Sequence, residues 1–249
     1  MKSNKARASL TIVFLYTLCL SPGLSQQQQY PEPHTQTDES NRNMRPENAL
    51  ALLRAGNERF VRGTVMTRPL RQQVRETARG QFPFAVVLSC QDSRTESQLL
   101  FDLNNGDAFT IKIAGNIVNP DIQGGLEFGI GPHYAKLIAV IGHTDCGAVK
   151  GTIDNKQAID DGQQGNLINL LRKIRPALDR VDPKIVPKTS RNPVYVDAAA
   201  KENVLLAMGE IRRNPAIRAD LDSGRVDLIG GMYDVKTGEV SFFRDKPGR

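Results

Sequence analysis

An apolar run long enough to cross a bilayer and a basic stripe interleaved with aromatic residues are both missing from this 249-residue chain. The apolar run near the N-terminus, Ala8 to Leu20, has only 13 residues, whereas a membrane-spanning helix needs about 20. Without Lys2, Lys5 and Arg7 of that region, the chain has 30 basic and 27 acidic residues, and its formal charge falls from +6 to +3. Because the remaining basic residues are scattered among acidic ones, we expect no nucleic-acid partner.

The first 25 residues have the layout of a secretory signal peptide. A basic start is followed by the apolar run, a Ser-Pro-Gly break and a small residue at Ser25. We therefore expect residues 1–25 to be cleaved and the protein to be exported, either to the periplasm or into the medium. No membrane span would remain after cleavage. An uncleaved membrane anchor is the alternative.

Residues 26–44 are polar and include four consecutive glutamines. This composition buries too little apolar surface to fold alone, so we expect a disordered polar tether. His34 lies in this segment and is expected to be a solvated linker residue. The remaining residues, 45–249, are enough for one sizeable domain.

Continuous apolar runs in this domain indicate buried strands of a parallel sheet. These runs occupy residues 84–89, 109–114 and 136–142, and helix-like segments lie between them at 96–103 and 124–130. The alternation predicts an α/β fold with a mainly parallel central sheet flanked by helices. Further helices are expected at 46–62, 70–79, 166–178 and 198–212, and a last pair of strands at 226–233 and 239–243.

Two short polar segments follow two of the predicted strands and contain side chains that bind metals. The first holds Cys90, Asp92 and Arg94, and the second holds His143 and Cys146. Because ligands bind at the carboxyl ends of parallel strands, we expect these residues to converge. Two thiolates and one imidazole leave the fourth position of a tetrahedral zinc open, as in catalytic sites. A disulfide between the two cysteines is the alternative reading for an exported protein.

Asp92 and Arg94 have a chemical role beside such a zinc ion. Zinc with two thiolates and a neutral imidazole carries no net charge, so it acidifies bound water less than a site with three histidines. A carboxylate outside the metal that accepts a hydrogen bond from the hydroxide would orient it, and Arg94 would keep Asp92 ionised. An ordinary surface ion pair is the alternative.

The two segments resemble the motifs of β-class carbonic anhydrases, which are Cys-x-Asp-Ser-Arg, here starting at Cys90, and His-x-x-Cys-Gly, here starting at His143. Further segments occur in the order of that family, namely 113–116, 125–128, 147–151 and 231–234. The resemblance implies one Zn²⁺ held by Cys90, His143 and Cys146 in a single zinc-dependent catalytic domain. It also implies an N-terminal helical arm and the reversible hydration of carbon dioxide to bicarbonate and a proton by a zinc-bound hydroxide.

The same resemblance implies roles for two further side chains and an assembly. Asp92 would be a conditional fourth zinc ligand in a closed state, and Gln81 would donate to substrate oxygen from the neighbouring subunit. The default for Gln81 is a solvated loop residue. The assembly would be a homodimer or a dimer of dimers in which the arm embraces the partner. Because the chain has no tryptophan, we do not expect the regulatory bicarbonate pocket that some bacterial members build with that residue.

Two other functions use the same residues. A zinc hydrolase acting on carbonyl sulfide or carbon disulfide would need the same hydroxide, and a noncatalytic zinc-storing or redox-sensing protein would need only the metal ligands. Lys112 and Lys150 are expected to be solvated charges, with steering of bicarbonate as the alternative. His133 is expected at the surface and not as a metal ligand.

Overall fold

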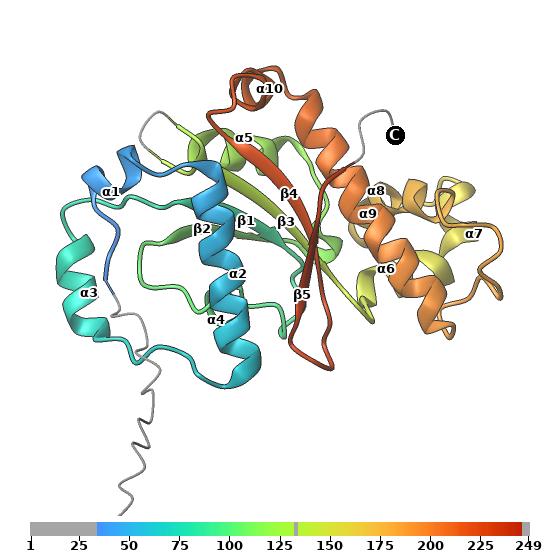
Figure 1. Cartoon of the computed structure of the whole chain (residues 1–249). Helices are drawn as coiled ribbons and strands as arrows, with labels where there is room; N and C mark the ends of the chain where they lie inside the picture. Colours follow the sequence, from blue (N-terminus) through green and yellow to red (C-terminus); the bar gives the residue numbers. More distant parts are fainter. Residues whose placement is uncertain (1–33, 132–133, 246–249) are drawn as a thin grey trace, which may run out of the picture. The chain divides into compact units, whose positions relative to one another are not determined.

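The computed structural model describes residues 34–131 and 134–245 and contains a five-stranded sheet in the order β2-β1-β3-β4-β5 (Figure 1). Strands β1 to β4 are parallel, and β5 runs antiparallel to β4. The strands are β1 (Ala85–Ser89), β2 (Ala108–Lys112), β3 (Leu137–His143), β4 (Asp227–Tyr233) and β5 (Val240–Phe243). The expected α/β fold with a mainly parallel sheet is therefore confirmed, as is the predicted last pair of strands.

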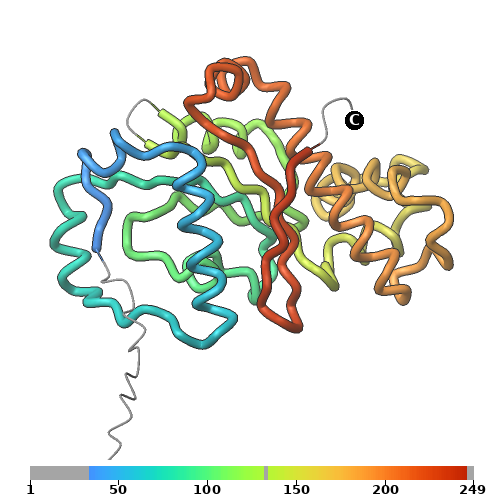
Figure 2. The backbone as a smooth tube through the Cα atoms, in the orientation of Figure 1, coloured from blue at the N-terminus to red at the C-terminus, as the bar shows by residue number. Residues whose placement is uncertain are grey.

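Helices cover both faces of this sheet, which is why its central strands are apolar throughout. On one face, Val87 of β1 packs in a core cluster with Leu53 of α2 (Pro46–Arg62). On the other face, Val86 and Leu88 pack with Met208 of α9. The helices of this second face are α5 (Pro120–Gly129), α9 (Pro193–Arg213) and α10 (Pro215–Asp222), and their arrangement can be followed in Figures 1 and 2.

A third apolar cluster lies at the carboxyl end of the sheet and contains both Cys90 and Cys146. It joins α9 to three helices that follow β3, namely α6 (Gly147–Asp154), α7 (Lys156–Asp160) and α8 (Asn166–Leu178). The two cysteines are therefore surrounded by aliphatic side chains such as Val149 and Ile174. The fold thus buries both cysteine side chains.

Local signals explain where several helices begin and end. Helix α2 occupies the predicted residues because Pro46 takes the first helical position and Gly63, with φ of 66°, ends it. Helix α8 also matches its predicted range. Helices α5 and α9 begin earlier than predicted because Asn119 and Asn192 cap them. Helices α3 (Leu70–Thr77) and α4 (Ser97–Leu100) are shorter than predicted, and strand β2 ends two residues before its predicted end. Helices α6, α7 and α10 were not predicted.

The predicted tether differs from the structure at its C-terminal end. Helix α1 (Asp38–Arg42) is capped by Thr37, and Asn41 is buried with its amide donating to the Pro83 carbonyl at 2.9 Å. The amide of Asn104 donates to the carbonyl of His34, whose residue is exposed as expected. Residues 34–44 therefore belong to the domain, because buried hydrogen bonds hold them where apolar side chains are lacking.

Several predictions concern residues that the structure does not describe. The signal peptide over residues 1–25, residues 26–33 of the tether and the surface position of His133 all lie outside the described ranges. Within residues 34–131 and 134–245, no helix combines the length and the apolar character needed to cross a membrane.

Candidate metal centre

Two neighbouring parallel strands bring three candidate ligands to one place. Cys90 directly follows β1, His143 is the last residue of β3, and Cys146 precedes the first turn of α6. Because Ser89 pairs with Ile141 in the sheet, both strands end at the same edge. The ligand atoms of the three residues lie within 4.8 Å of one another. The side chains are 4%, 0% and 2% exposed, and both cysteines are free, so the disulfide alternative is not realised.

The imidazole of His143 is oriented by its own backbone. Its Nδ1 lies 2.9 Å from the Thr144 carbonyl oxygen, which can only accept, so Nδ1 carries the proton and donates. Its Nε2 is buried and has no hydrogen-bond partner among the described residues. A buried polar atom without a partner is costly, whereas a metal ion at this nitrogen would satisfy it. The residues present therefore fit a zinc ion.

The Cys90 sulfur is set up as a thiolate in the metal-free protein. A hydrogen bond from the Cys146 thiol is the largest cause that lowers the pKa of Cys90, to about 4, against an opposing effect of burial. The backbone N–H groups of Asp92 and Gly115 also donate to this sulfur, at 3.4 and 3.3 Å. The pKa of Cys146 is raised because its proton is held between the two sulfurs and because it is buried. A dication would take the place of that proton.

The Cys90 thiolate also affects the pKa of the His143 imidazole. Burial lowers the pKa of His143, but the negative charges of Cys90 and Asp92 and the hydrogen bond to the Thr144 carbonyl outweigh it and raise the pKa overall. Two thiolates and a neutral imidazole match the charge of Zn²⁺, and they are ligand types that it prefers.

Asp92 lies beside the candidate ligands and is held by Arg94. The guanidinium donates to both carboxylate oxygens at 2.9 Å, and the Arg94 backbone N–H donates to Oδ1 at 2.9 Å. These bonds hold the pKa of Asp92 far below its usual range and raise the pKa of Arg94. Asp92 Oδ2 is 3.9 Å from Nε2 of His143. The structure thus shows Asp92 in its arginine-bound arrangement, and its role as a conditional fourth ligand stays a prediction.

Acidic and basic side chains form the rim beside this pair. Asp145 has φ of 59°, its backbone N–H donates to Asp197 at 2.8 Å, and its carboxylate contacts Lys150 and lies 3.9 Å from Nη1 of Arg94. The Lys150 contact lowers the pKa of Asp145. Lys112 similarly pairs with Glu96 at 3.2 Å. Lys112 and Lys150, the two lysines considered for steering bicarbonate, therefore each form an ion pair with an acidic residue.

Gln81 is not brought to this centre within the chain. It is exposed and precedes β1, whereas Cys90 follows β1, so the two residues lie at opposite ends of that strand. The predicted catalytic role of Gln81 therefore depends on a neighbouring subunit.

The sequence reasoning missed Gly115 as part of the centre. This glycine has φ of 67° and donates its N–H to Cys90, and a Cβ atom there would lie 2.4 Å from Cδ1 of Ile174. Only glycine fits, because other residues would collide and would be strained at positive φ. The single signal in the sequence was its place within residues 113–116, quoted above for the resemblance.

Known proteins share this sequence pattern and fold. The family model described as carbonic anhydrase matches residues 85–240. The chain is 30% identical over 201 residues to a carbonic anhydrase of Mycolicibacterium smegmatis, covering 80% of this chain and 93% of the relative. It is also 30% identical over 203 residues to carbonic anhydrase 2 of Mycobacterium tuberculosis, with the same coverage of 80% and 93%.

Solved structures agree on the fold. The β-carbonic anhydrase CcaA superposes with a TM-score of 0.62 at 24% identity, covering 70% of this chain and 85% of that one. The Coccomyxa β-carbonic anhydrase in complex with acetazolamide gives a TM-score of 0.59 at 23% identity, covering 69% and 76%. The sequence match places this chain in the carbonic anhydrase family, and its fold is that of the β-class structures.

Proposed function

We propose that this protein is a zinc-dependent carbonate dehydratase that interconverts carbon dioxide with bicarbonate and a proton. One observation carries the proposal, which is the buried group of Cys90, His143 and Cys146 with an unpartnered Nε2, in a chain of the carbonic anhydrase family. These three residues would hold Zn²⁺. When bound, zinc lowers the pKa of water and so supplies a hydroxide nucleophile.

The side chains around the three ligands would orient the reacting groups. Asp92 is ionised at all working pH values because Arg94 lowers its pKa, so its carboxylate only accepts hydrogen bonds. A carboxylate in that state fixes the direction of an O–H group beside it. The Thr144 carbonyl fixes the imidazole tautomer. The Arg94 side chain is 46% exposed, so this side of the centre faces solvent.

The alternative substrates and the noncatalytic alternative are less well supported. The curated relatives with the coverage given above are carbonic anhydrases by name, which favours carbon dioxide over carbonyl sulfide or carbon disulfide. A protein that only stores zinc or senses redox state has no use for Asp92 bound at both oxygens by Arg94.

The test compares two substrates. Purified zinc-loaded protein is assayed for carbon dioxide hydration by stopped flow and for carbon disulfide hydrolysis. Rapid hydration of carbon dioxide, with little turnover of carbon disulfide, is expected. Turnover of carbon disulfide alone would reassign the substrate, and zinc-loaded protein inactive on both would contradict an enzymatic role.

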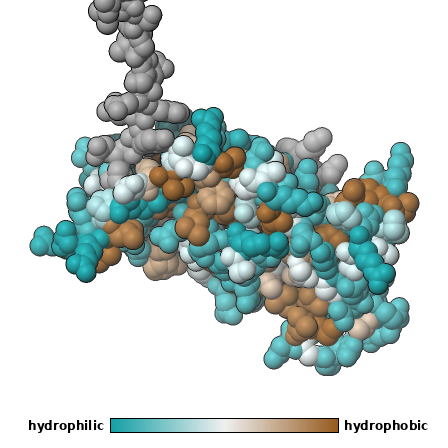
Figure 3. Space-filling view, turned by 90° about the horizontal axis from the view of Figure 1, so that it is seen from below, coloured by the Kyte–Doolittle hydropathy of each residue, from teal (hydrophilic) through white to brown (hydrophobic). Residues whose placement is uncertain are grey.

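The proposal includes an assembly of at least two chains. One fold neighbour is titled a tetrameric β-carbonic anhydrase from Sordaria macrospora, with a TM-score of 0.56 at 21% identity, covering 69% of this chain and 89% of that one. Large apolar side chains are exposed on the N-terminal arm, and Figure 3 shows apolar patches on the face seen from below. The exposed side chains of the arm lie on α2, on α3 and on the loop between these helices, and they are Leu52, Val61, Val65, Leu70 and Val74. Sedimentation analysis would show a dimer or a dimer of dimers, and a monomer would contradict this part.

Export is the last part of the proposal. It rests on the sequence of residues 1–25 and predicts a mature chain that begins near Gln26. N-terminal sequencing of protein recovered from the periplasm or medium of its host would test this. An intact Met1 in a cytosolic fraction would contradict it.

A further inference from the structure

Gly115 is held at both of its backbone polar groups, and one of the two bonds leads to the metal centre. Its N–H donates to the Cys90 sulfur at 3.3 Å, and its carbonyl oxygen accepts from Nδ2 of Asn203 at 2.6 Å. Asn203 lies in the middle of α9, is 2% exposed, and is separated from Gly115 by 88 positions. A side chain from a distant helix thus fixes the peptide next to the one that faces Cys90.

The segment around Gly115 does not adopt its conformation from local forces alone. Gly115 has φ of 67° and Asn116 has φ of 42°, so two consecutive residues are left-handed. A left-handed residue other than glycine is strained and persists only where its surroundings hold it. Within the segment, the Asn116 N–H donates to the Ile113 carbonyl at 2.9 Å. The amide of Asn203, which lies outside this segment, donates a hydrogen bond that helps to keep Gly115 in place.

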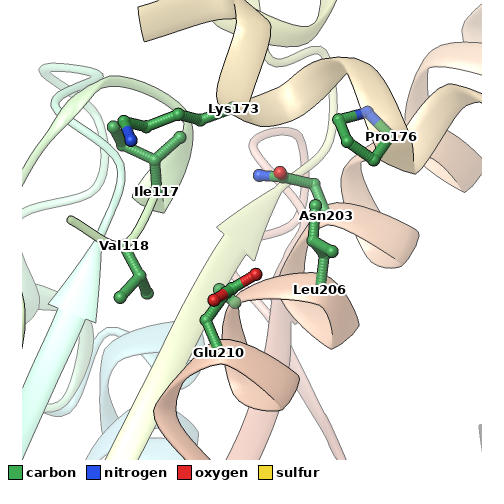
Figure 4. Close-up of a pocket in the computed structure, with 8 residues that line it drawn as sticks. Ile117, Val118, Lys173, Pro176, Asn203, Leu206 and Glu210 are labelled. Atoms are coloured by element: carbon green, nitrogen blue, oxygen red, sulfur yellow. The ribbon is translucent and has the colours of Figure 1, made fainter. Parts of the chain in front are cut away.

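Space beside Asn203 permits this side chain to be changed without a collision. Asn203 lines a cavity of about 240 Å³ between α8, α9 and the segment that follows Gly115. Figure 4 shows its side chain extending from α9 toward the segment that carries Ile117 and Val118, with Leu206 beside it. A side chain of similar shape without an amide therefore has room there.

We propose that Asn203 is a positioning residue for the metal centre, which acts through Gly115 to keep a backbone N–H directed at the Cys90 sulfur. It does not touch the metal or the substrate. Without its amide, the buried Gly115 carbonyl loses its donor and the peptide is free to rotate away, so the thiolate loses one of two N–H bonds. Bonds of this kind, one step outside the ligands, typically affect metal affinity by about 10- to 100-fold.

The test measures zinc affinity in two matched variants. Asn203→Leu should weaken zinc binding by about 10- to 100-fold in competition with a chromophoric chelator. It should also shift the sulfur-to-metal charge-transfer band of the cobalt-substituted protein. The control is Asn57→Leu, because Asn57 is also buried and its amide donates to the carbonyls of Leu100 and Gly238, at 3.1 and 2.9 Å, away from the ligands.

Both variants should lower the melting temperature, but the control should keep zinc affinity within about twofold, since it is remote from the ligands. Equal zinc affinity in the wild type and Asn203→Leu, with an unshifted cobalt band, would overturn the inference. If Asn203→Leu does not fold, Asn203→Ala is measured with and without formamide. Formamide replaces the lost amide through the cavity and should restore part of the zinc affinity, and unchanged affinity would again overturn the inference.

The inference rests on the proposed function only in taking Cys90 as a zinc ligand. Wild-type protein that binds no zinc would refute the proposed function itself. Wild-type protein that binds zinc tightly, together with an Asn203→Leu variant that binds it as tightly, would refute the positioning role alone.

Discussion

Asp92 and Asp102 are both bound by arginine, and they differ in almost every other respect. Asp92 pairs with Arg94, two positions away, and the side chains are 17% and 46% exposed. The side chain of Asp102 is completely buried and pairs with Arg59 at 2.5 Å and with Arg68. It also accepts from the Met66 backbone N–H at 3.1 Å.

The difference indicates that the Asp92 pair belongs to the candidate metal centre, whereas the Asp102 pairs stabilise the fold. Breaking a buried pair leaves a charge without compensation, so the Asp102 cluster is fixed once the chain has folded. It ties α2 and the loop after it to the end of α4. The Asp92 pair lies near water and beside a candidate ligand, so breaking it does not leave a charge in the interior. Binding of a metal ion or substrate at the metal centre should change the contacts of Asp92. It should leave the contacts of Asp102 unchanged.

The largest effect is expected in the zinc-free protein, where Cys90 of the metal centre should titrate far below the usual range of a cysteine. The pKa of Cys90 is lowered to about 4, so thiolate absorbance should persist at neutral pH and disappear as the pH falls through about 4. An unfolded cysteine has a pKa of about 8.5. The stabilisation from this thiolate is therefore complete above about pH 8.5 and is lost as the pH falls to the folded value.

Ultraviolet titration of zinc-free wild type, Cys90→Ser and Asp102→Asn would measure this. The transition should be missing from Cys90→Ser and present in whatever fraction of Asp102→Asn is folded. A thiolate that appears only above pH 8 would show that the centre is not set up in advance.

The next largest effect is expected at the buried cluster. Asp102→Asn leaves Arg59 and Arg68 without a counter-charge in the interior, which should cost about 3–5 kcal/mol of unfolding free energy. Denaturant unfolding of the zinc-loaded protein measures it. Turnover for each folded molecule should stay near the wild-type value, and a loss of turnover with normal stability would reverse the contrast between the two aspartates.

A smaller effect, and one of a different kind, is expected for Asp92→Asn. Zinc should stay bound because Cys90, His143 and Cys146 are intact, while turnover should fall by about 10- to 100-fold as the oriented acceptor is lost. Zinc content and hydration rate are measured on the same sample. Unchanged turnover would make this pair an ordinary surface ion pair.

The smallest effect is expected at the rim. Lys150→Gln removes the contact with Asp145, and both side chains are partly exposed, at 36% and 50%. Such pairs contribute about 0–1 kcal/mol, so stability, zinc content and turnover should all stay close to wild type. A clear fall of turnover at low salt that is abolished at high salt would instead show that Lys150 steers bicarbonate.

Sequence alone was enough where signals are local. Pro46 and Gly63 bound α2, apolar runs mark β1 and β3, and Cys90 and His143 follow from their place at the strand ends. The order of strands and helices was sufficient for the fold class, since parallel strands need helical connections.

What could not be predicted depends on contacts between distant residues. Asn41 and Asn203 look like ordinary polar residues in the sequence, but each is buried with its amide on a distant backbone carbonyl. The predicted tether therefore includes residues 34–44, which belong to the domain. The hydrogen bond from Asn203 to Gly115 was not predicted. Helices α6 and α7 were missed because glycine-containing and short polar segments give weak helical patterns.

The parallel pairing of β1 with β3 also decides when zinc can be captured. Ligands from Cys90 and His143 come together only after two strands with a long connection between them have paired, and pairing across such a connection is slow. A partly folded chain therefore has no complete set of ligands. Interactions absent until the end of folding slow unfolding and leave the folding rate unchanged. Zinc should accordingly act as a kinetic lock on the finished molecule and not as a template for its assembly.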